Sequence, residues 1–492
     1  MMDKEIIGIK NIREIEIIYI FLVLILTSLI TLSTFYCFHH SISAVFFPFD
    51  IDYGEGIQLH LATMIYEGKN TYQDIYSYPF IACNYPPLYP LVSAGLISVL
   101  GKSFLAGRLI SFIASLLLCF LIYRIVKEET DNTFVSVISS LIFLSLPHIP
   151  SWCPLFRIDT LSTFFCLSGI YIVYRYEGSR NIYLSIPLFI LAIYTKQSAI
   201  VTSFVAFLYL FFKNKKLGLK WLCIFLLISA TIFLIINQVT NGQFYFHTIR
   251  YNVISFNIQW MLNLDFLFIM VYAIFLCFAI IHYKNSKSSL LHLYFLISLA
   301  STWIMAGREG SQYNYFIESM AVMCIFTGCF LNREGIAFSF NLREEFKKER
   351  SYLHVLIVAL MIFQLLIFSL IYTYPSGFYI YSLPDERAGQ EIYMYAANAK
   401  GQVLVEDLGF AILNDKDALI DSFLMHELEK KGLWNSSKLV EDCKAKKFSL
   451  IIFYWRFNSF QELRECIDEN YEKVDEIYYR GSNYLVYKPR SL

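Results

Sequence analysis

The sequence predicts an α-helical polytopic membrane protein of about eleven transmembrane helices, followed by a small α/β domain outside the membrane. Hydrophobic residues make up 57% of the 492 residues, and the mean hydropathy is +0.51. An ordinary soluble protein reaches neither value. Aromatic residues make up 18% of the chain, as expected where tyrosine and tryptophan anchor helices at the membrane interface. The long apolar runs stop near residue 375, and the remaining sequence has the mixed composition of a soluble domain.

The first apolar run covers about residues 17–35 and follows three cationic residues. It is longer than the apolar region of a signal peptide and lacks a small-residue cleavage site, so we expect a retained span. A long polar outer loop follows, over about residues 37–105. Its segment 87–100 is apolar but short, so we expect this segment to lie along the membrane surface or to re-enter the membrane.

Ten further apolar segments complete the predicted bundle, at about residues 106–126, 133–149, 160–176, 181–195, 198–212, 218–238, 264–283, 289–306, 313–331 and 352–374. Some of these segments are shorter than the roughly 20 residues that a full crossing needs. We therefore predict a transmembrane domain over residues 1–374 and an extracytoplasmic domain over residues 375–492.

Lysine and arginine collect in cytoplasmic loops, and this rule orients the bundle. With the N-terminus inside, every inner loop carries several cations, whereas the outer connections carry only isolated ones. If segment 87–100 were a full span, all later loops would invert and the bias would disappear. We therefore predict a multi-pass protein of the cell (inner) membrane, with a cytoplasmic N-terminus and an outer C-terminal domain.

The predicted outer domain of roughly 110 residues is large enough to fold alone. We expect short buried strands and amphipathic helices in it, with strands at 402–406, 449–454 and 484–487 and helices at 422–431, 437–447 and 460–470. Only Cys443 and Cys466 lie together in a polar region, where a disulfide between them is one alternative. The other cysteines are scattered without a CxxC pair, so a metal cluster is not expected.

Charged residues recur where the outer loops meet the membrane. The first outer loop contains Asp50, Asp52 and Glu55, and a carboxylate at such a depth costs several kcal/mol unless it is paired or functional. Later outer connections add a second set of polar residues: Arg157, Asp159, Lys196, Gln197, Arg308, Glu309, Tyr313 and Asn314. Because loops that are distant in sequence reach one depth, we predict an active site on the outer face.

Each of these residues also has a purely structural explanation. The Arg-Ile-Asp and Arg-Glu pairs could be loop ion pairs, and the lone lysine could extend from the end of a span toward water. The two carboxylates of the Asp-x-x-Glu motif could cap a helix, and the tyrosine could be an interface aromatic. His247 and Arg250 are more typical of a loop surface than of a ligand-binding site. The convergence of five outer loops favours a site over these separate explanations.

Several motifs resemble those of GT-C membrane glycosyltransferases, with the closest likeness to family 39-like and aminoarabinose-transferase-like bacterial proteins, which are related to protein O-mannosyltransferases. The motifs are Asp52-Tyr53-Gly54-Glu55-Gly56, Tyr85-Pro86-Pro87-Leu88-Tyr89-Pro90, Ala106-Gly107-Arg108-Leu109, Arg157-Ile158-Asp159, Thr195-Lys196-Gln197 and Gly310-Ser311-Gln312-Tyr313-Asn314-Tyr315. This resemblance covers most of the membrane region, and the tail after about residue 375 contributes no activity motif.

The resemblance implies an enzyme that takes a sugar from a polyprenyl-phosphate donor at the outer face and passes it to a glycan, lipid or protein acceptor. Such enzymes place an acidic residue of the first outer loop near the acceptor. This chain has Asp-x-x-Glu instead of an adjacent pair, so Asp52 is the first candidate for the base and Glu55 the second. The two carboxylates could hold a divalent cation, but the motif does not specify one.

The chemistry of such a transfer suits the same residues. A base must take the proton of the acceptor, and a cation must stabilise the departing phosphate. Arg157, Lys196 and Arg308 are the candidates for phosphate binding, and a single displacement would invert the anomeric centre. The supporting residues would be Asp159, Gln197, Glu309, Tyr313 and Asn314. A GxGxxG-type loop for a nucleotide sugar does not stand out in the sequence, which favours a lipid donor. The net charge of zero indicates no general basic surface for binding nucleic acid.

Two other classes of protein fit part of the pattern. A transporter or flippase for a lipid-linked sugar would show inverted repeats and charges near the midplane, whereas here the charges lie at the membrane edge. A non-catalytic scaffold could use the outer domain for binding, but it would not need charges that converge on the membrane side. The transferase is therefore the favoured interpretation.

The orientation can be tested by cysteine labelling. A cysteine introduced near residue 400 should react with a membrane-impermeant reagent in intact cells, because the charge pattern places residues after about 375 outside. Labelling only after the membrane is permeabilised would show that this orientation, and with it the shared outer site, is wrong.

Overall fold

The computed structural model describes residues 2–252, 254–286, 289–336, 348–373 and 383–490. Every predicted apolar segment corresponds to a helix, and these helices are α1 (Met2–Phe46), α4 (Leu105–Thr130), α5 (Thr133–Ser145), α7 (Asp159–Arg175), α8 (Ser185–Thr195), α9 (Ile200–Lys213), α10 (Lys215–Val239), α12 (Ile258–Asn285), α13 (Leu290–Met305), α14 (Ile317–Arg333) and α15 (Lys348–Thr373). Among the described residues, six helices are long and apolar enough to cross a membrane, and shorter apolar helices lie between them. The predicted polytopic helical fold is confirmed.

Helix α14 forms the centre of the bundle, and its residues from 319 to 331 are all buried. Small residues let the neighbouring helices approach closely, because a Cβ atom at Gly328 would lie 2.8 Å from Ser139 of α5. At that contact Ser139 Oγ donates a hydrogen bond of 2.6 Å to the carbonyl of Cys324. Close packing and interhelical hydrogen bonds of this kind hold membrane helices together where lipid leaves no hydrophobic driving force between them.

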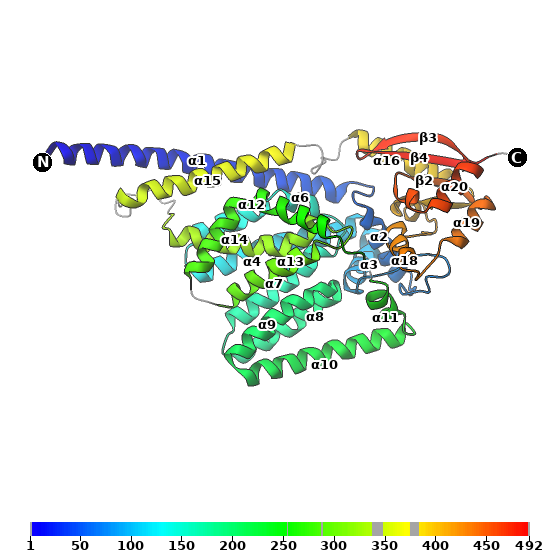
Figure 1. Ribbon diagram of the computed structural model, residues 1–492, viewed down its shortest axis with the longest axis horizontal. Helices are drawn as coiled ribbons and strands as arrows, with labels where there is room; N and C mark the ends of the chain where they lie inside the picture. Colours follow the sequence, from blue (N-terminus) through cyan, green and yellow to red (C-terminus); the bar gives the residue numbers. More distant parts are fainter. Residues whose placement is uncertain (1, 253, 287–288, 337–347, 374–382, 491–492) are drawn as a thin grey trace.

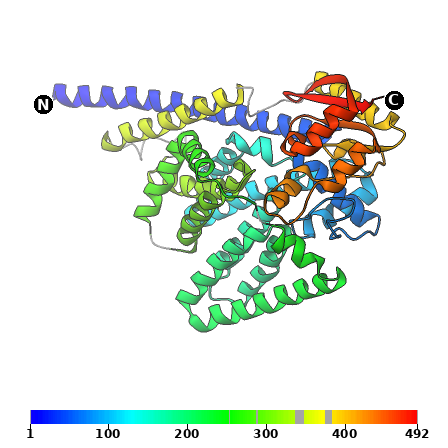
Figure 2. The same cartoon turned by 45° about the vertical axis from the view of Figure 1, so that its right-hand side comes forward.

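Helices α1 and α15 run side by side along one edge of the bundle, and α10 lies at the opposite edge (Figures 1 and 2). The C-terminal domain and the first outer loop lie together at the end of the bundle where α1 finishes, far from the N-terminus (Figure 1). The first outer loop contains α2 (Tyr53–Tyr66) and α3 (Leu88–Leu100). Helix α3 matches the short apolar segment of the sequence, and it packs against α2 and α4.

The C-terminal domain contains a four-stranded sheet in the order β1-β2-β4-β3. Strands β1 and β2 are parallel, and the other pairs are antiparallel. Its elements are α16 (Leu383–Asn398), β1 (Gln402–Val405), α17 (Gly409–Ile412), α18 (Ser422–Lys430), α19 (Ser437–Lys444), β2 (Phe448–Phe453), α20 (Gln461–Asn470), β3 (Tyr471–Tyr479) and β4 (Ser482–Pro489). The expected strands and helices are all present, and the predicted boundary at residues 374 and 375 lies outside the described residues.

Strand β3 is an element that the sequence did not predict. It is an edge strand, and four of its residues are charged (Glu472, Lys473, Asp475 and Glu476), so it lacks the apolar run of a buried strand. The turn between β3 and β4 places Arg480 and Gly481 at φ angles of +49° and +76°, as a two-residue hairpin with the favoured twist requires. Cys443 and Cys466 are free and buried, so the disulfide alternative is not realised.

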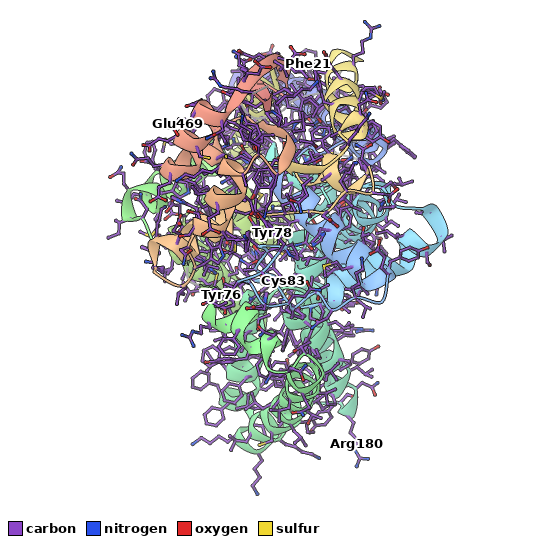
Figure 3. All side chains as sticks on the ribbon, turned by 90° about the vertical axis from the view of Figure 1, so that its right-hand side faces the viewer. Phe21, Tyr76, Tyr78, Cys83, Arg180 and Glu469 are labelled. Atoms are coloured by element: carbon purple, nitrogen blue, oxygen red, sulfur yellow. The ribbon has the colours of Figure 1, made fainter. Side chains whose placement is uncertain are left out.

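The C-terminal domain shares its core with the first outer loop. Phe80 of that loop donates its amide to the carbonyl of Leu419 at 2.8 Å, and its side chain is buried in one cluster with residues of the sheet domain. The hydroxyls of Tyr76 and Tyr78 reach the carbonyl of Leu433 at 2.9 Å and the carboxylate of Asp442 at 3.2 Å. Figure 3 shows both tyrosines between the two parts. The loop and the C-terminal domain therefore pack as one structural unit.

Candidate functional site

A cavity of about 490 Å³ lies between the end of the bundle where α1 finishes (Figure 1) and the C-terminal domain. Segments that are far apart in the sequence line it: Asp52 and Tyr53 at the start of α2, Asn84 and Tyr85 in the proline-rich segment, Arg157 before α7, Trp260 in α12, Glu309 and Tyr315 in the loop before α14, and Phe423, Trp455 and Arg456 of the C-terminal domain. The size is that of a small-ligand site. The fold thus brings together several of the loops that the sequence analysis singled out.

Asp52 stands on the wall of this cavity. It is the N-cap of α2, and its Oδ2 accepts the amide of Gly54 at 3.0 Å. The same oxygen accepts a hydrogen bond of 2.8 Å from Nη1 of Arg157. A Cβ atom at position 54 would lie 1.7 Å from that nitrogen, so glycine is required for the guanidinium to cross the helix start. The structure therefore pairs Asp52 with Arg157 at the cavity, two residues that the sequence analysis singled out separately.

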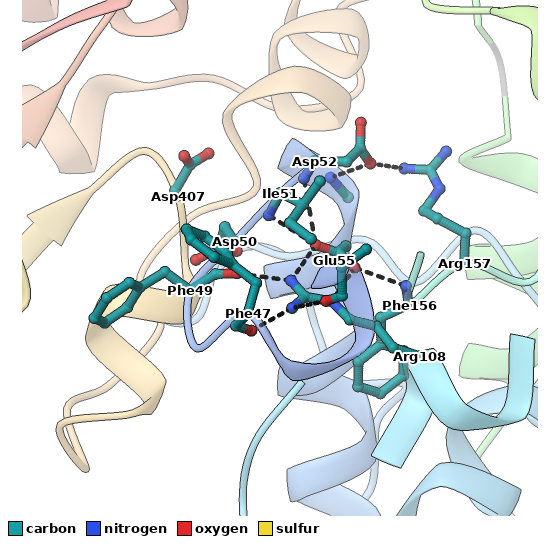
Figure 4. A network of polar contacts seen from close by, with 12 residues as sticks. Phe47, Phe49, Asp50, Ile51, Asp52, Glu55, Arg108, Phe156, Arg157 and Asp407 are labelled. Atoms are coloured by element: carbon teal, nitrogen blue, oxygen red, sulfur yellow. Dashed lines mark hydrogen bonds and ion pairs between the residues drawn. The ribbon is translucent and has the colours of Figure 1, made fainter. Parts of the chain in front are cut away.

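Glu55 occupies a different environment. It is fully buried and forms an ion pair with Arg108, with distances of 2.7 Å from Nη2 to Oε2 and 2.8 Å from Nε to Oε1. Its oxygens also accept the amides of Phe156 at 2.7 Å and Ile51 at 2.8 Å (Figure 4). Burial raises the pKa of Glu55, but Arg108 and these hydrogen bonds outweigh burial and lower the pKa below its ordinary value.

This geometry gives Glu55 a structural role, whereas the sequence analysis made it the second candidate for the base. Glu55 does not line the cavity, and together with Asp52 it completes a capping box at the start of α2. The helix-cap explanation therefore holds for both carboxylates, and only Asp52 also faces the cavity.

Behind the cavity wall lies a second pair of charges. Lys196 Nζ donates to Oδ1 of Asp159 at 2.8 Å, and Nε of Arg157 lies 3.9 Å from Oδ2 of Asp159. The Lys196 ammonium also sits 4.3 Å from the ring centre of Tyr315. Asp52, Arg157, Asp159 and Lys196 therefore form a row of alternating charge. Lys196 is one layer behind the cavity, held by an ion pair and by a cation–π contact.

The third predicted cation is not part of this row. Arg308 Nη2 donates to Oδ1 of Asn252 at 2.7 Å, and Arg308 is not a lining residue. The reason lies in the backbone, because Asn257 donates to the carbonyl of Gly307 at 2.7 Å and Glu309 donates to the carbonyl of Ser255 at 2.8 Å. This pairing turns the arginine toward the 252 loop and leaves Glu309 on the cavity. The expectation that three cations meet at one phosphate is corrected to one lining arginine with a lysine behind it.

The supporting residues hold the loops around the site. Gln197 Nε2 donates to the carbonyl of Asn84 at 2.6 Å, which ties the proline-rich segment to the bundle. Asn314 is buried beside the cavity wall, next to the lining residue Tyr315. The ring of Tyr313 stacks on His148 with a centroid distance of 3.6 Å, away from the cavity lining.

His247 was expected at the loop surface, but its side chain is buried. Nδ1 accepts the amide of Cys83 at 2.8 Å, and Nε2 donates to the carbonyl of Gln73 at 2.6 Å. Burial lowers the pKa of His247 to about 4, which agrees with a neutral ring that accepts at one nitrogen and donates at the other. Because Cys83 lines the cavity, His247 fixes part of the cavity wall.

Arg456 is a lining residue that the sequence did not reveal. Its guanidinium lies 4.2 Å from the ring centre of Tyr53, 4.5 Å from that of Trp455 and 4.9 Å from that of Phe423. Arg456 lies just after the carboxyl end of β2. Its backbone amide donates a hydrogen bond of 3.0 Å to the carboxylate of Glu406, which lies just after the end of β1. Ligands in α/β folds collect at the carboxyl ends of parallel strands, and that rule was the available signal. Among the described residues, no group of three His, Cys, Asp or Glu side chains is placed to hold a metal ion.

The structural role of Glu55 can be tested by measuring the stability of variants. Glu55→Gln leaves the buried Arg108 guanidinium without its counter-charge, so we expect a loss of about 3–5 kcal/mol in the free energy of unfolding. Asp52→Asn is the matched control, because asparagine is as good an N-cap as aspartate and the change should cost little. Thermal unfolding of the purified variants in detergent measures both. Equal unfolding temperatures for Glu55→Gln and wild type would contradict this structural role of Glu55.

Comparison with known proteins gives one family match over part of the chain and a fold shared with solved structures. The profile of the dolichyl-phosphate-mannose-protein mannosyltransferase family matches residues 84–240. Two crystal structures of ArnT from Cupriavidus metallidurans share the fold, each with a TM-score of 0.60 and covering 94% of this chain and 98% of that one. The structure bound to undecaprenyl phosphate is 10% identical and the apo structure 12%. No curated protein sequence matches the chain. The family match covers less than half of the chain, and the likeness to the ArnT structures shows a shared fold, that of a polytopic helical membrane protein with a small C-terminal sheet domain.

Proposed function

We propose that the protein transfers a sugar from a polyprenyl-phosphate donor to a hydroxyl group of a glycan, lipid or protein acceptor at the outer face of the membrane, with inversion. The observation that carries this proposal is the Asp52–Arg157 ion pair of 2.8 Å on the cavity wall, because it joins a base and an anion-binding cation at one place. The fold shared with an ArnT structure that holds undecaprenyl phosphate supports the donor class.

The lining of the cavity suits a lipid-linked phosphate. Ile57, Leu61, Ile254 and Leu424 give it an apolar side, and Asp52 and Arg157 give it a polar side. Ligand sites of this kind combine many apolar contacts with a few polar groups that fix orientation. The first isoprene units would lie on the apolar side, and the phosphate would meet Arg157, whose planar guanidinium suits phosphate oxygens.

The row of charges explains how the transfer would proceed. Two cations and two carboxylates, Arg157, Lys196, Asp52 and Asp159, give the row a net charge of zero. When Asp52 takes the proton of the acceptor hydroxyl, the row becomes positive by one unit. This positive charge appears beside the phosphate at the moment when the phosphate leaves with an additional negative charge, so the row favours the transition state over the ground state.

Asp52→Asn tests the base. Asparagine keeps the helix cap but cannot accept the proton, so we expect turnover to fall by about 10²–10⁴-fold. The measurement is the incorporation of labelled sugar from a polyprenyl-phosphate donor into envelope material in membranes that contain each variant. Binding of undecaprenyl phosphate to the purified variant should stay near wild type and serves as the control. Near wild-type turnover for Asp52→Asn would exclude Asp52 as the base.

Arg157→Gln tests the phosphate contact. Loss of a charge-assisted contact of about 1.5–3 kcal/mol should weaken binding of undecaprenyl phosphate by about 10–150-fold. Arg308→Gln is the matched control, because Arg308 bonds to Asn252 and does not line the cavity. Lys196→Gln should give a smaller effect, since Lys196 acts through Asp159. An equal loss in the Arg157 and Arg308 variants, or no loss in either, would refute this phosphate site.

A further inference from the structure

A second cleft, of about 310 Å³, meets the first cavity at Asp52. It is lined by the start of α2 and by the strand ends of the C-terminal domain: Ile51, Asp52, Tyr53, Tyr454, Arg456, Arg480, Ser482 and Tyr484. Asp52, Tyr53 and Arg456 line both spaces. The carboxylate assigned as the base is therefore reached from two directions.

The two spaces differ in chemistry. The first cavity has an apolar side formed by isoleucines, leucines and tryptophans. In the second cleft every lining residue except Ile51 has a polar side chain, and three of the residues are tyrosines. Tyrosine offers a flat apolar ring together with a hydroxyl, which suits a sugar ring better than a hydrocarbon chain. A lipid-linked donor thus fits the first space, and a polar carbohydrate fits the second.

The two arginines of the second cleft are in different states. Arg480 is already paired with a carboxylate, because its Nη2 donates to Asp407 at 3.1 Å. Its Nη2 also donates to Tyr484 at 3.1 Å, and its Nη1 donates to the carbonyl of Asp50 at 2.7 Å.

Arg456 has no comparable partner within the described residues. Its nearest carboxylate oxygen belongs to Glu406, 4.0 Å from Nε, and the Glu406 oxygens already accept three backbone amides, those of Tyr454, Trp455 and Arg456. The Nε atom of Arg456 is buried without a hydrogen-bond partner. Three aromatic rings hold the guanidinium in place, so it presents unused donors where the two spaces meet.

We infer that the second cleft is the acceptor subsite, and that Arg456 binds a phosphate or carboxylate group of an anionic carbohydrate acceptor. This inference rests on the proposed function. The acceptor hydroxyl would approach Asp52 from the side opposite the donor. Its proton passes to the Asp52 carboxylate, the acceptor oxygen forms a bond to the anomeric carbon, and the bond from that carbon to the phosphate oxygen breaks, with its electron pair leaving on the phosphate.

Direct binding to purified protein in detergent tests the assignment, with glucose 6-phosphate and glucuronate as anionic probes and glucose as the neutral one. We expect the wild type to bind at least one anionic probe about tenfold more tightly than glucose, as one charge-assisted contact provides. Arg456→Gln should abolish this preference and leave binding of undecaprenyl phosphate unchanged. Arg157→Gln should do the reverse, weakening binding of undecaprenyl phosphate and retaining the preference for the anionic sugar.

A second pair of variants tests the cleft without altering charge. Ser482→Phe should fill the cleft and weaken binding of the anionic sugar while binding of undecaprenyl phosphate remains. Asn483→Phe is its matched control, because successive residues of β4 point to opposite faces of the sheet, and Asn483 is exposed and is not a lining residue. Ser482→Phe with wild-type sugar binding would overturn the assignment of the cleft.

Three further results would overturn the inference. In the first, the wild type shows no preference for an anionic sugar. In the second, the Arg456→Gln variant keeps that preference. In the third, Arg456→Gln weakens binding of undecaprenyl phosphate as much as Arg157→Gln does. The last result would place Arg456 with the donor. Unchanged binding of undecaprenyl phosphate in Arg157→Gln would instead count against the proposed function, so the two failures are distinguishable.

Discussion

The end of the molecule that holds the cavity depends on the buried ion pair between Glu55 and Arg108. An arginine has five N–H donors, and all five of Arg108 are used: two donate to Glu55 and three to the carbonyls of Ala44, Phe47 and Phe49. The end of α1, the start of α2 and helix α4 are thereby joined at one point. A buried ion pair adds little net stability by itself, but a fully bonded one fixes the geometry of its surroundings.

This pair also sets the position of the reactive groups. Glu55 accepts the amide of Asp52 at 3.3 Å and the amide of Phe156 at 2.7 Å. Phe156 immediately precedes Arg157 in the chain. The buried Glu55 carboxylate therefore holds the backbone of Asp52 and the backbone next to Arg157, and the side chains of these two residues meet at the cavity. A shift of Glu55 would move both partners of the Asp52–Arg157 pair. The inert carboxylate of the motif therefore positions the one assigned as the base.

Parts of this arrangement follow from the sequence, and parts depend on contacts that a sequence does not reveal. Apolar length located the eleven bundle helices, and the recurrence of outer charges located Asp52 and Arg157. The motif Asp-x-x-Glu fits a helix cap and a catalytic pair equally well, and only burial separates Asp52 from Glu55. Arg308 and Glu309 are neighbours in sequence, yet the bridge between Phe256 and Arg308 decides which one reaches the cavity. Arg456 is one arginine in a tail without a known motif, and it joins the site only because the sheet domain packs on the first outer loop.

The hydrogen bonds of His247 make the first outer loop sensitive to acid. A protonated ring could no longer accept the amide of Cys83. In the unfolded chain a histidine takes up a proton below about pH 6.5, whereas burial lowers the pKa of His247 in the folded protein to about 4. The unfolded loop therefore binds more protons between these values, and the loop loses stability as the pH falls through that range. The part of the cavity wall that contains Cys83 is therefore held by a hydrogen bond that weakens in acid, because the ring that accepts this bond must stay neutral.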